Sequence, residues 1–178
     1  RFRLALQDGQ NTGWYFDQRD NRDRLLRYVG DARVLDLYSY VGAWSLRAFE
    51  GGAKTVTAVD ASAPALAQLT RNAALNGVEV ETLQGQVLEV LSTLARERRQ
   101  FDVVVLDPPA LIRKRKDHKS GLEHYQRVNN AALALLAPGG IFVSCSCSFH
   151  LANDELGRVL LRAARQNHRL LQILEQGG

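Results

Sequence analysis

Short aliphatic runs alternate with longer amphipathic segments through most of the chain, and this alternation constrains the fold more than any other feature. The clearest run is Val103–Leu106, whose three valines and one leucine are typical of a strand buried on both faces of a sheet. Strands separated by helices predict an α/β fold: a Rossmann-like, doubly wound, mostly parallel sheet with helices on both faces. The expected strands are 34–38, 55–60, 80–83, 103–106, 141–145 and 170–174, and the expected helices are 25–29, 43–50, 61–75, 87–99, 125–136 and 153–166.

Residues 1–30 differ from this pattern. The runs Phe2–Leu6 and Trp14–Phe16 flank a polar turn that contains glycine, and they predict a short β-hairpin. A linking helix that ends at Gly30 is expected to follow. We therefore divide the chain into residues 1–30, the hairpin and its helix, and residues 31–178, the sheet domain. A chain of 178 residues with 46% hydrophobic side chains suits one core.

Acidic residues stand where three of the expected strands end. Asp107 is followed by two prolines, which lack an N–H group and stop the strand abruptly. Asp36 and Asp60 stand at the ends of the first two strands, and ligands of open α/β sheets bind at the carboxyl edge. An acid after the second strand suits ribose hydroxyls, so the layout predicts a nucleoside site. The alternative is that Asp36 and Asp60 merely end strands.

The turn Tyr38–Gly42 narrows the choice of nucleoside. It lacks the three glycines of a dinucleotide fingerprint. Bulky Tyr38 and Tyr40 would obstruct the close backbone approach that a pyrophosphate needs. A nucleoside without phosphates makes no such demand, so the turn favours S-adenosylmethionine over NAD.

Cys145 and Cys147 are the only cysteines of the chain, and they stand at the end of the fifth expected strand. A pair at this spacing rarely forms a disulfide, and free thiols suit a reducing cytosol. A thiolate is a good nucleophile, yet free cysteine is also among the residue types most often buried. The residues alone leave both interpretations open for Cys147, whereas we expect Cys145 to pack in the core. Cys147 is expected to lie beside the Asp107 turn if the strands 103–106 and 141–145 are neighbours.

The net charge of +4 and the isoelectric point near 9.3 slightly favour a polyanionic partner. The densest basic segment is 113–119, with five cations in seven positions directly after the Asp107 turn. It suits phosphate neutralisation, and the alternative is a solvated surface loop. The four histidines show no metal-ligand spacing with the cysteines, and no apolar run could span a bilayer. We therefore expect neither a metal nor a membrane partner.

Four motifs follow one another along the chain, and they are Asp36–Gly42, Asp60, Asp107–Pro109 and Pro138–Gly140. Together they resemble the ordered motifs of class I S-adenosylmethionine-dependent methyltransferases. Two further blocks, Gly13–Arg22 and Ser144–Ser148, resemble more narrowly the bacterial 23S ribosomal RNA cytosine-C5 methyltransferases. This resemblance covers nearly the whole chain. It implies S-adenosylmethionine as cofactor and methyl transfer to C5 of a cytosine in 23S ribosomal RNA, through a cysteine adduct at C6, in the cytoplasm.

Members of that family carry an N-terminal PUA domain, end their sheet with a hairpin, and often form homodimers. We expect this chain to comprise the catalytic domain without the PUA domain and without the C-terminal end of the sheet. Two alternatives stay open: a ribosomal RNA methyltransferase that acts on a guanine nitrogen, and a non-catalytic RNA-binding module with the same fold.

The resemblance assigns Cys147 as the nucleophile, and Asp107 either orients the cytosine or acts as the base; we favour orientation. Ala110 stands where other RNA cytosine-C5 enzymes have a second cysteine, so the group that removes the C5 proton is unassigned. Gln86 stands where the family usually has aspartate. The residues expected to contact the cofactor are Arg19, Asp36, Tyr38, Ser39, Gly42, Asp60, Ala61, Gln86, Asp107 and Pro108. Those expected to contact the RNA are Gln18, Pro109, Arg113, Lys114, Arg115 and Lys116.

Overall fold

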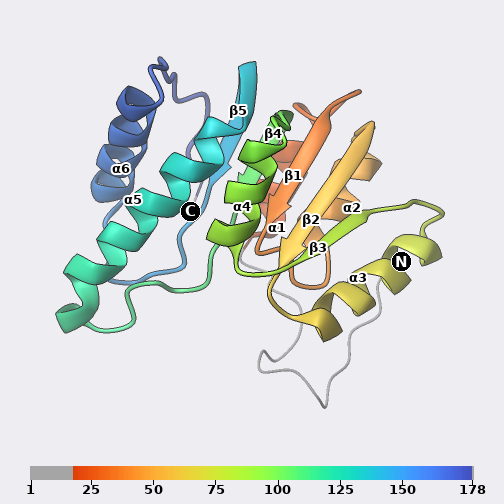
Figure 1. The fold of residues 1–178 in the computed structure, drawn as a ribbon, viewed down its shortest axis with the longest axis horizontal. Coiled ribbons are helices and arrows are strands. Elements are labelled where there is room, and N and C mark those ends of the chain that lie inside the picture. Colours follow the sequence, from red (N-terminus) through yellow and green to blue (C-terminus); the bar gives the residue numbers. More distant parts are fainter. Residues whose placement is uncertain (1–17, 178) are drawn as a thin grey trace.

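Five parallel strands form one sheet in the part of the chain that the computed structural model describes, residues 18–177 (Figure 1). The strands are β1 (Arg33–Leu37), β2 (Thr55–Asp60), β3 (Glu81–Gln84), β4 (Phe101–Leu106) and β5 (Leu136–Ser144). Their order is β3-β2-β1-β4-β5, which reverses between β1 and β4. Doubly wound sheets bind ligands at such a reversal. The predicted α/β class is confirmed.

Helices cover both faces of the sheet, as predicted. They are α1 (Arg19–Leu25), α2 (Ala43–Glu50), α3 (Ala63–Leu75), α4 (Val87–Arg96), α5 (His118–Ala134) and α6 (Asn153–Gln166), with a 3₁₀ turn, η1 (Arg115–Asp117), before α5. Alternate side chains of each strand point to opposite faces. Val103 and Val105 accordingly pack with α1 and α2, whereas Val104 and Leu106 pack with α4, α5 and α6.

Three element boundaries differ clearly from the prediction. Helix α1 spans Arg19–Leu25 and ends at Leu25, whereas a helix at 25–29 that ends at Gly30 was expected; the apolar residues after Leu25 lie in turns and irregular structure instead. Helix α5 begins at His118 rather than at residue 125, because the end of the basic segment and the polar residues after it form its first turns. Strand β5 begins at Leu136 and passes through the Pro-Gly-Gly sequence that was expected to end a helix. The register with β4 is irregular there, and a Cβ on Gly140 would lie 2.7 Å from the Asp102 carbonyl oxygen. Glycine at this position therefore allows the two strands to approach.

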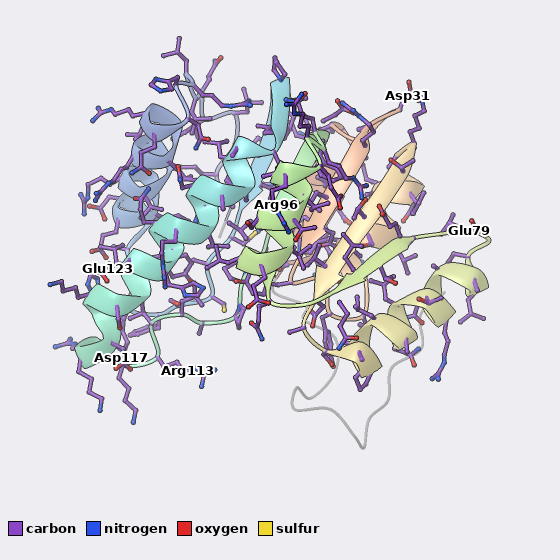
Figure 2. The ribbon with its side chains drawn as sticks, viewed as in Figure 1. Asp31, Glu79, Arg96, Arg113, Asp117 and Glu123 are labelled. Carbon is purple, nitrogen blue, oxygen red and sulfur yellow. The ribbon has the colours of Figure 1, made fainter. Side chains whose placement is uncertain are left out.

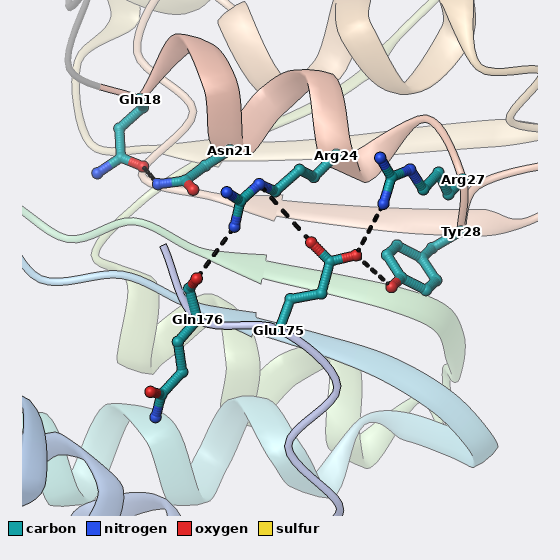
Figure 3. A network of polar contacts seen from close by, with 7 residues as sticks. All are labelled: Gln18, Asn21, Arg24, Arg27, Tyr28, Glu175 and Gln176. Atoms are coloured by element: carbon teal, nitrogen blue, oxygen red, sulfur yellow. Dashed lines mark hydrogen bonds and ion pairs between the residues drawn. The ribbon is translucent and has the colours of Figure 1, made fainter. Parts of the chain in front are cut away.

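The prediction of a sixth strand at 170–174 is wrong. This segment has no regular structure, and the chain runs from it back to α1 (Figure 3). Glu175 Oε1 accepts a hydrogen bond from the Tyr28 hydroxyl at 2.6 Å, and the Gln176 carbonyl oxygen accepts one from Arg24 at 3.0 Å. The aliphatic pattern of the segment is compatible with a strand, but a strand also needs a paired neighbour, and polar contacts with α1 hold the following residues instead.

The expected hairpin, Phe2–Phe16, lies outside the described residues. Among residues 18–177, none of the helices combines the length and the apolar content that are needed to cross a bilayer.

Candidate active site

The carboxyl edge of the sheet gathers the acids that the sequence singled out. Asp36 is the penultimate residue of β1, Asp60 ends β2, and Asp107 follows β4. Strand β1 lies between β2 and β4, and β4 pairs with β5, so four strand ends stand side by side. Figure 2 shows Arg113, in the segment after Asp107, at the end of the molecule opposite Asp31, which precedes β1. The predicted clustering of these acids is confirmed.

Asp36 is the fully buried acid of this edge. Its Oδ2 accepts a hydrogen bond from Ser45 Oγ of α2 at 2.6 Å, while its Oδ1 has no partner among the described residues. Burial raises the pKa of Asp36 to about 7, and the nearby charges of Asp107 and Asp60 act in the same direction. The hydrogen bond from Ser45 opposes this shift. The site thus holds an acid that titrates near neutrality.

The turn after β1 has an unusual backbone. Tyr38 and Tyr40 have φ angles of 63° and 48°, in the left-handed region that residues other than glycine rarely adopt. Gly42 follows with a φ of 89°, and a Cβ there would lie 2.6 Å from Leu69 Cγ. Such strained backbone clusters at ligand sites in proteins, which supports the prediction that this turn contacts a ligand.

Asp60 holds this turn in place from the end of β2. Its Oδ2 accepts a hydrogen bond from the Tyr40 N–H at 2.9 Å, and its Oδ1 accepts one from the Ser62 N–H at 2.8 Å. Each carboxylate oxygen keeps a second lone pair. Beside it, Ser39 Oγ is buried and has no partner within residues 18–177. Buried polar atoms normally find partners, so Ser39 Oγ and Asp36 Oδ1 fit a polar ligand at this turn.

Asp107 is oriented by a residue that the sequence reasoning missed. Trp44 Nε1–H of α2 donates a hydrogen bond to Asp107 Oδ2 at 2.8 Å. The guanidinium carbon of Arg22, a buried residue of α1, lies 6.0 Å from the centre of the Trp44 ring. Trp44 lies two residues after Gly42, and this closeness in sequence to the predicted turn is the signal that could have identified it. One oxygen of Asp107 is therefore fixed, and the half-buried carboxylate has a defined direction.

The two cysteines have different environments. Cys145 is buried beside Val105 in the core that faces α1 and α2, as expected. Cys147 is exposed, and its Sγ lies 3.6 Å from the Pro108 carbonyl oxygen. The segment after β5 therefore brings the Cys147 thiol against the Asp-Pro-Pro turn. The expectation that Cys147 lies beside this turn because β4 and β5 are neighbours is confirmed.

The serines on either side of Cys147 contact Tyr125, a buried residue of α5. The Tyr125 hydroxyl lies 2.9 Å from Ser146 Oγ and 2.9 Å from Ser148 Oγ. Ser148 Oγ also accepts a hydrogen bond from the Ile112 N–H at 3.1 Å. Sequence reasoning missed Tyr125, because nothing in its local pattern separates it from an ordinary aromatic residue of a helix core.

The remaining predicted residues lie around the rim. The exposed ones are Arg19, Ala61, Gln86, Pro109, Arg113, Lys114, Arg115 and Lys116. Gln18 is half-buried, and its Oε1 accepts a hydrogen bond from Asn21 at 2.9 Å and lies 3.9 Å from Cys145 Sγ. Within residues 18–177, no three histidine, cysteine or acidic side chains form a group that could hold a metal ion. The contacts of the rim residues with cofactor and RNA stay predictions.

Comparison with known proteins gives consistent matches. The family of S-adenosylmethionine-dependent methyltransferases matches residues 1–176. A "Ribosomal RNA large subunit methyltransferase" of Deinococcus radiodurans is 38% identical over 172 residues, which are 95% of this chain and 42% of the relative. A "Ribosomal RNA large subunit methyltransferase I" of Klebsiella pneumoniae is 36% identical over 176 residues, which are 97% of this chain and 44% of the relative. The chain thus spans less than half the length of these relatives.

Among solved structures, the methyltransferase-like protein SMU.776 complexed with SAH matches with a TM-score of 0.78 and 23% identity, covering 88% of this chain and 42% of that one. A SAM-dependent methyltransferase from Agrobacterium tumefaciens matches with a TM-score of 0.71 and 21% identity, covering 86% and 52%. At these identities the two likenesses show the fold.

Proposed function

The chain belongs to the family of S-adenosylmethionine-dependent methyltransferases, and from this premise we propose that it methylates C5 of a cytosine in large-subunit ribosomal RNA. In this proposal Cys147 forms a covalent bond to C6 of the cytosine. The curated relatives support the RNA substrate, because both carry names that specify ribosomal RNA of the large subunit.

The exposed thiol of Cys147 is the observation that carries the proposal. It stands 3.6 Å from the carbonyl oxygen of Pro108, one residue after the oriented carboxylate of Asp107. C5 of cytosine is a poor nucleophile, so a cytosine-C5 enzyme needs a nucleophile at C6, and cysteine is well suited to this role. Methyl transfer to an amino group of a base needs no nucleophile at C6, so it would not explain a thiol at this place.

S-Adenosylmethionine is the cofactor of this family, and it supplies an electrophilic methyl group when bound. We propose that the turn Tyr38–Gly42 and the carboxylate of Asp60 hold its nucleoside part. The free lone pairs of Asp60 suit the ribose hydroxyls, and the buried Ser39 hydroxyl lacks a partner among the described residues. The further proposed contacts are the buried Pro108 and three exposed residues of the rim, Arg19, Ala61 and Gln86.

The reaction needs four changes at the base. The Cys147 thiolate adds to C6, and the electron pair of the C5–C6 double bond makes C5 nucleophilic. C5 would then bond the methyl carbon while the bond between that carbon and the sulfonium sulfur breaks, and the electron pair of the broken bond stays on the sulfur as a thioether. A base removes the remaining C5 proton, the electrons of that C–H bond restore the C5–C6 double bond, and the Cys147 thiolate leaves with the electrons of the S–C6 bond.

Asp107 suits the orientation of the cytosine in this scheme. Trp44 fixes the direction of the carboxylate, and a carboxylate can accept a hydrogen bond from the exocyclic amino group of the base. Ala110 offers no second thiol near the turn, so the proton acceptor stays unassigned. It also offers no aromatic face for stacking, which further separates this site from amine-methylating enzymes.

The exposed basic segment that begins at Arg113 supports an RNA partner. Its cations follow the Asp107 turn directly and are available to neutralise phosphates. We propose that Arg113, Lys114, Arg115 and Lys116 contact the backbone of the target strand, with Gln18 and Pro109 nearer to the base. A ribosomal RNA substrate would place the enzyme in the cytoplasm.

Labelled cofactor tests the proposal. The protein is incubated with methyl-labelled S-adenosylmethionine and large-subunit ribosomal RNA, and the RNA is digested to nucleosides. We expect the label in 5-methylcytidine. Label in a methylated guanosine, or no label despite demonstrated binding of RNA and cofactor, would contradict the proposal.

The two cysteines provide a matched pair of variants. Cys147→Ala should lower methyl transfer at least 1,000-fold, because the attack on C6 has no other thiol at the turn. Cys145→Ala should retain transfer within a fewfold and mainly reduce stability, by about 1 kcal/mol for a small buried side chain. The opposite result would assign the nucleophile to Cys145.

A further inference from the structure

Two serines flank Cys147, and both contact one hydroxyl group from another element. That hydroxyl belongs to Tyr125 of α5, whose side chain is fully buried and lies 2.9 Å from the Oγ of Ser146 and of Ser148. We propose that Tyr125 is a positioning residue for Cys147, which fixes the thiol against the Asp-Pro-Pro turn through these two serines. This inference rests on the proposed role of Cys147 as the nucleophile.

Hydrogen bonds tie the Cys147 segment to the chain on both sides of the Asp-Pro-Pro turn. Ser148 Oγ accepts a hydrogen bond from the Ile112 N–H at 3.1 Å, which links the Cys147 segment to the chain after the two prolines. Upstream, the Cys145 N–H donates to the Leu106 carbonyl oxygen at 2.8 Å. Cys147 lies between these two attachments, just past the end of β5, where a regular ladder no longer holds the backbone. The hydroxyl groups of Tyr125, Ser146 and Ser148, here called the hydroxyl cluster, hold the backbone of this segment instead.

Counting donors shows how the cluster is satisfied. Ser148 Oγ accepts from Ile112, and Ser146 Oγ accepts from the Ser148 N–H at 3.2 Å. If Ser148 donates to Tyr125 and Tyr125 donates to Ser146, the proton left over is on Ser146, which is half-exposed and can bind water. The reverse order would leave a donor on Ser148, which is only 6% exposed. The first arrangement is favoured because a buried donor without an acceptor is costly.

The ring of Tyr125 has a separate task from its hydroxyl. It packs with Ile112, Leu151 and Val159 between α5 and α6. Phenylalanine retains this ring, so Tyr125→Phe removes only the bridge between the serines. The buried Ser148 hydroxyl would then lack its acceptor, and the segment that carries Cys147 would have to rearrange to find another.

Two readouts on the intact protein test the inference. The first is methyl transfer to cytosine: Tyr125→Phe should lower kcat at least tenfold and change the KM for S-adenosylmethionine less than twofold. The second is the rate of alkylation of Cys147 by iodoacetamide, followed by mass spectrometry to separate it from buried Cys145. This rate should rise at least threefold, because the thiol is no longer held against Pro108.

Tyr28→Phe is the matched control, because the Tyr28 hydroxyl bonds Glu175 rather than the serines that flank Cys147 (Figure 3). It should leave both readouts unchanged. If Tyr125→Phe does not fold, Ser146→Ala removes one of the two contacts at a half-exposed position and should change both readouts in the same directions, about threefold for kcat and twofold for alkylation.

The outcomes separate this inference from the proposed function. A wild-type protein that makes no 5-methylcytidine would contradict the proposed function, while the alkylation rates would still decide whether Tyr125 positions the thiol. If the wild-type protein makes 5-methylcytidine and the folded variant keeps its kcat and its alkylation rate, Tyr125 is not a positioning residue.

Discussion

Replacing Asp36 by asparagine tests the buried acid of the site. Burial raises the pKa of Asp36 from its ordinary value of 3.8 to about 7 in the folded protein. Between these two values the folded state keeps a proton that the unfolded state has lost. The stability contributed by this proton is therefore fully present below pH 3.8 and is lost as the pH rises through 7. Asparagine is neutral throughout, so its stability should not follow this course.

The magnitude follows from the two pKa values. Linkage gives a wild-type loss of about 3 kcal/mol between pH 5 and pH 8 from this group alone. Asparagine can still accept the hydrogen bond from Ser45, while its amino group would occupy the place of the unpartnered Oδ1. That mismatch costs about 1–3 kcal/mol at every pH and cancels when the two pH values are compared.

Urea unfolding of the cofactor-free protein at pH 5 and pH 8 measures this difference. We expect the stability of Asp36→Asn relative to wild type to increase by about 3 kcal/mol between pH 5 and pH 8. Asp102→Asn is the control: a hydrogen bond from Arg33 is the main cause that lowers the pKa of Asp102 to about 2, so its effect should be the same at both pH values. A change below about 0.5 kcal/mol for Asp36→Asn would refute a raised pKa for this acid.

Two further predictions concern the orientation of Asp107 and the binding of RNA. Trp44→Phe removes the hydrogen bond to Asp107, which for a charged acceptor is worth about 1.5–3 kcal/mol. The variant should therefore lower methyl transfer about 10- to 100-fold, with unchanged affinity for S-adenosylmethionine. Full activity of this variant would show that Asp107 needs no orientation. Arg113→Gln combined with Lys114→Gln should weaken RNA binding and reduce the slope of log K against log salt by about 1.4, as two lost phosphate contacts require; an unchanged slope would identify the segment as a solvated loop.

The sequence allowed prediction of the sheet and of the position of its acids. The runs of valine and leucine, such as Val103–Leu106, mark strands that are buried on both faces, and parallel strands bring their carboxyl ends to one edge. Asp36, Asp60 and Asp107 could be assigned to this edge because each stands at a strand end. The predicted position of Cys147 beside the Asp107 turn depended on β4 and β5 being neighbours, which the topology confirms.

Features that depend on long-range pairing could not be predicted from local patterns. Leu170–Leu174 has a strand-like composition, but whether it pairs is decided by its neighbours, and Glu175, the residue after it, pairs with Arg24 of α1 instead. Tyr125 contacts residues 21 and 23 positions away, and Trp44 contacts a residue 63 positions away. Both look like ordinary aromatic residues of helices until the sheet places them beside the site.

These two aromatic residues support the site from opposite faces of the sheet. Trp44 lies on α2 and orients Asp107 from one face of the sheet, whereas Tyr125 lies on α5 and contacts the Cys147 segment from the other face. Ser45 adds a second contact from α2, to Asp36. In the proposed reaction, the group that holds the base and the group that attacks it are thus supported by different helices. The sheet between them fixes their separation, because neighbouring strands of a packed core cannot slide without losing their hydrogen bonds.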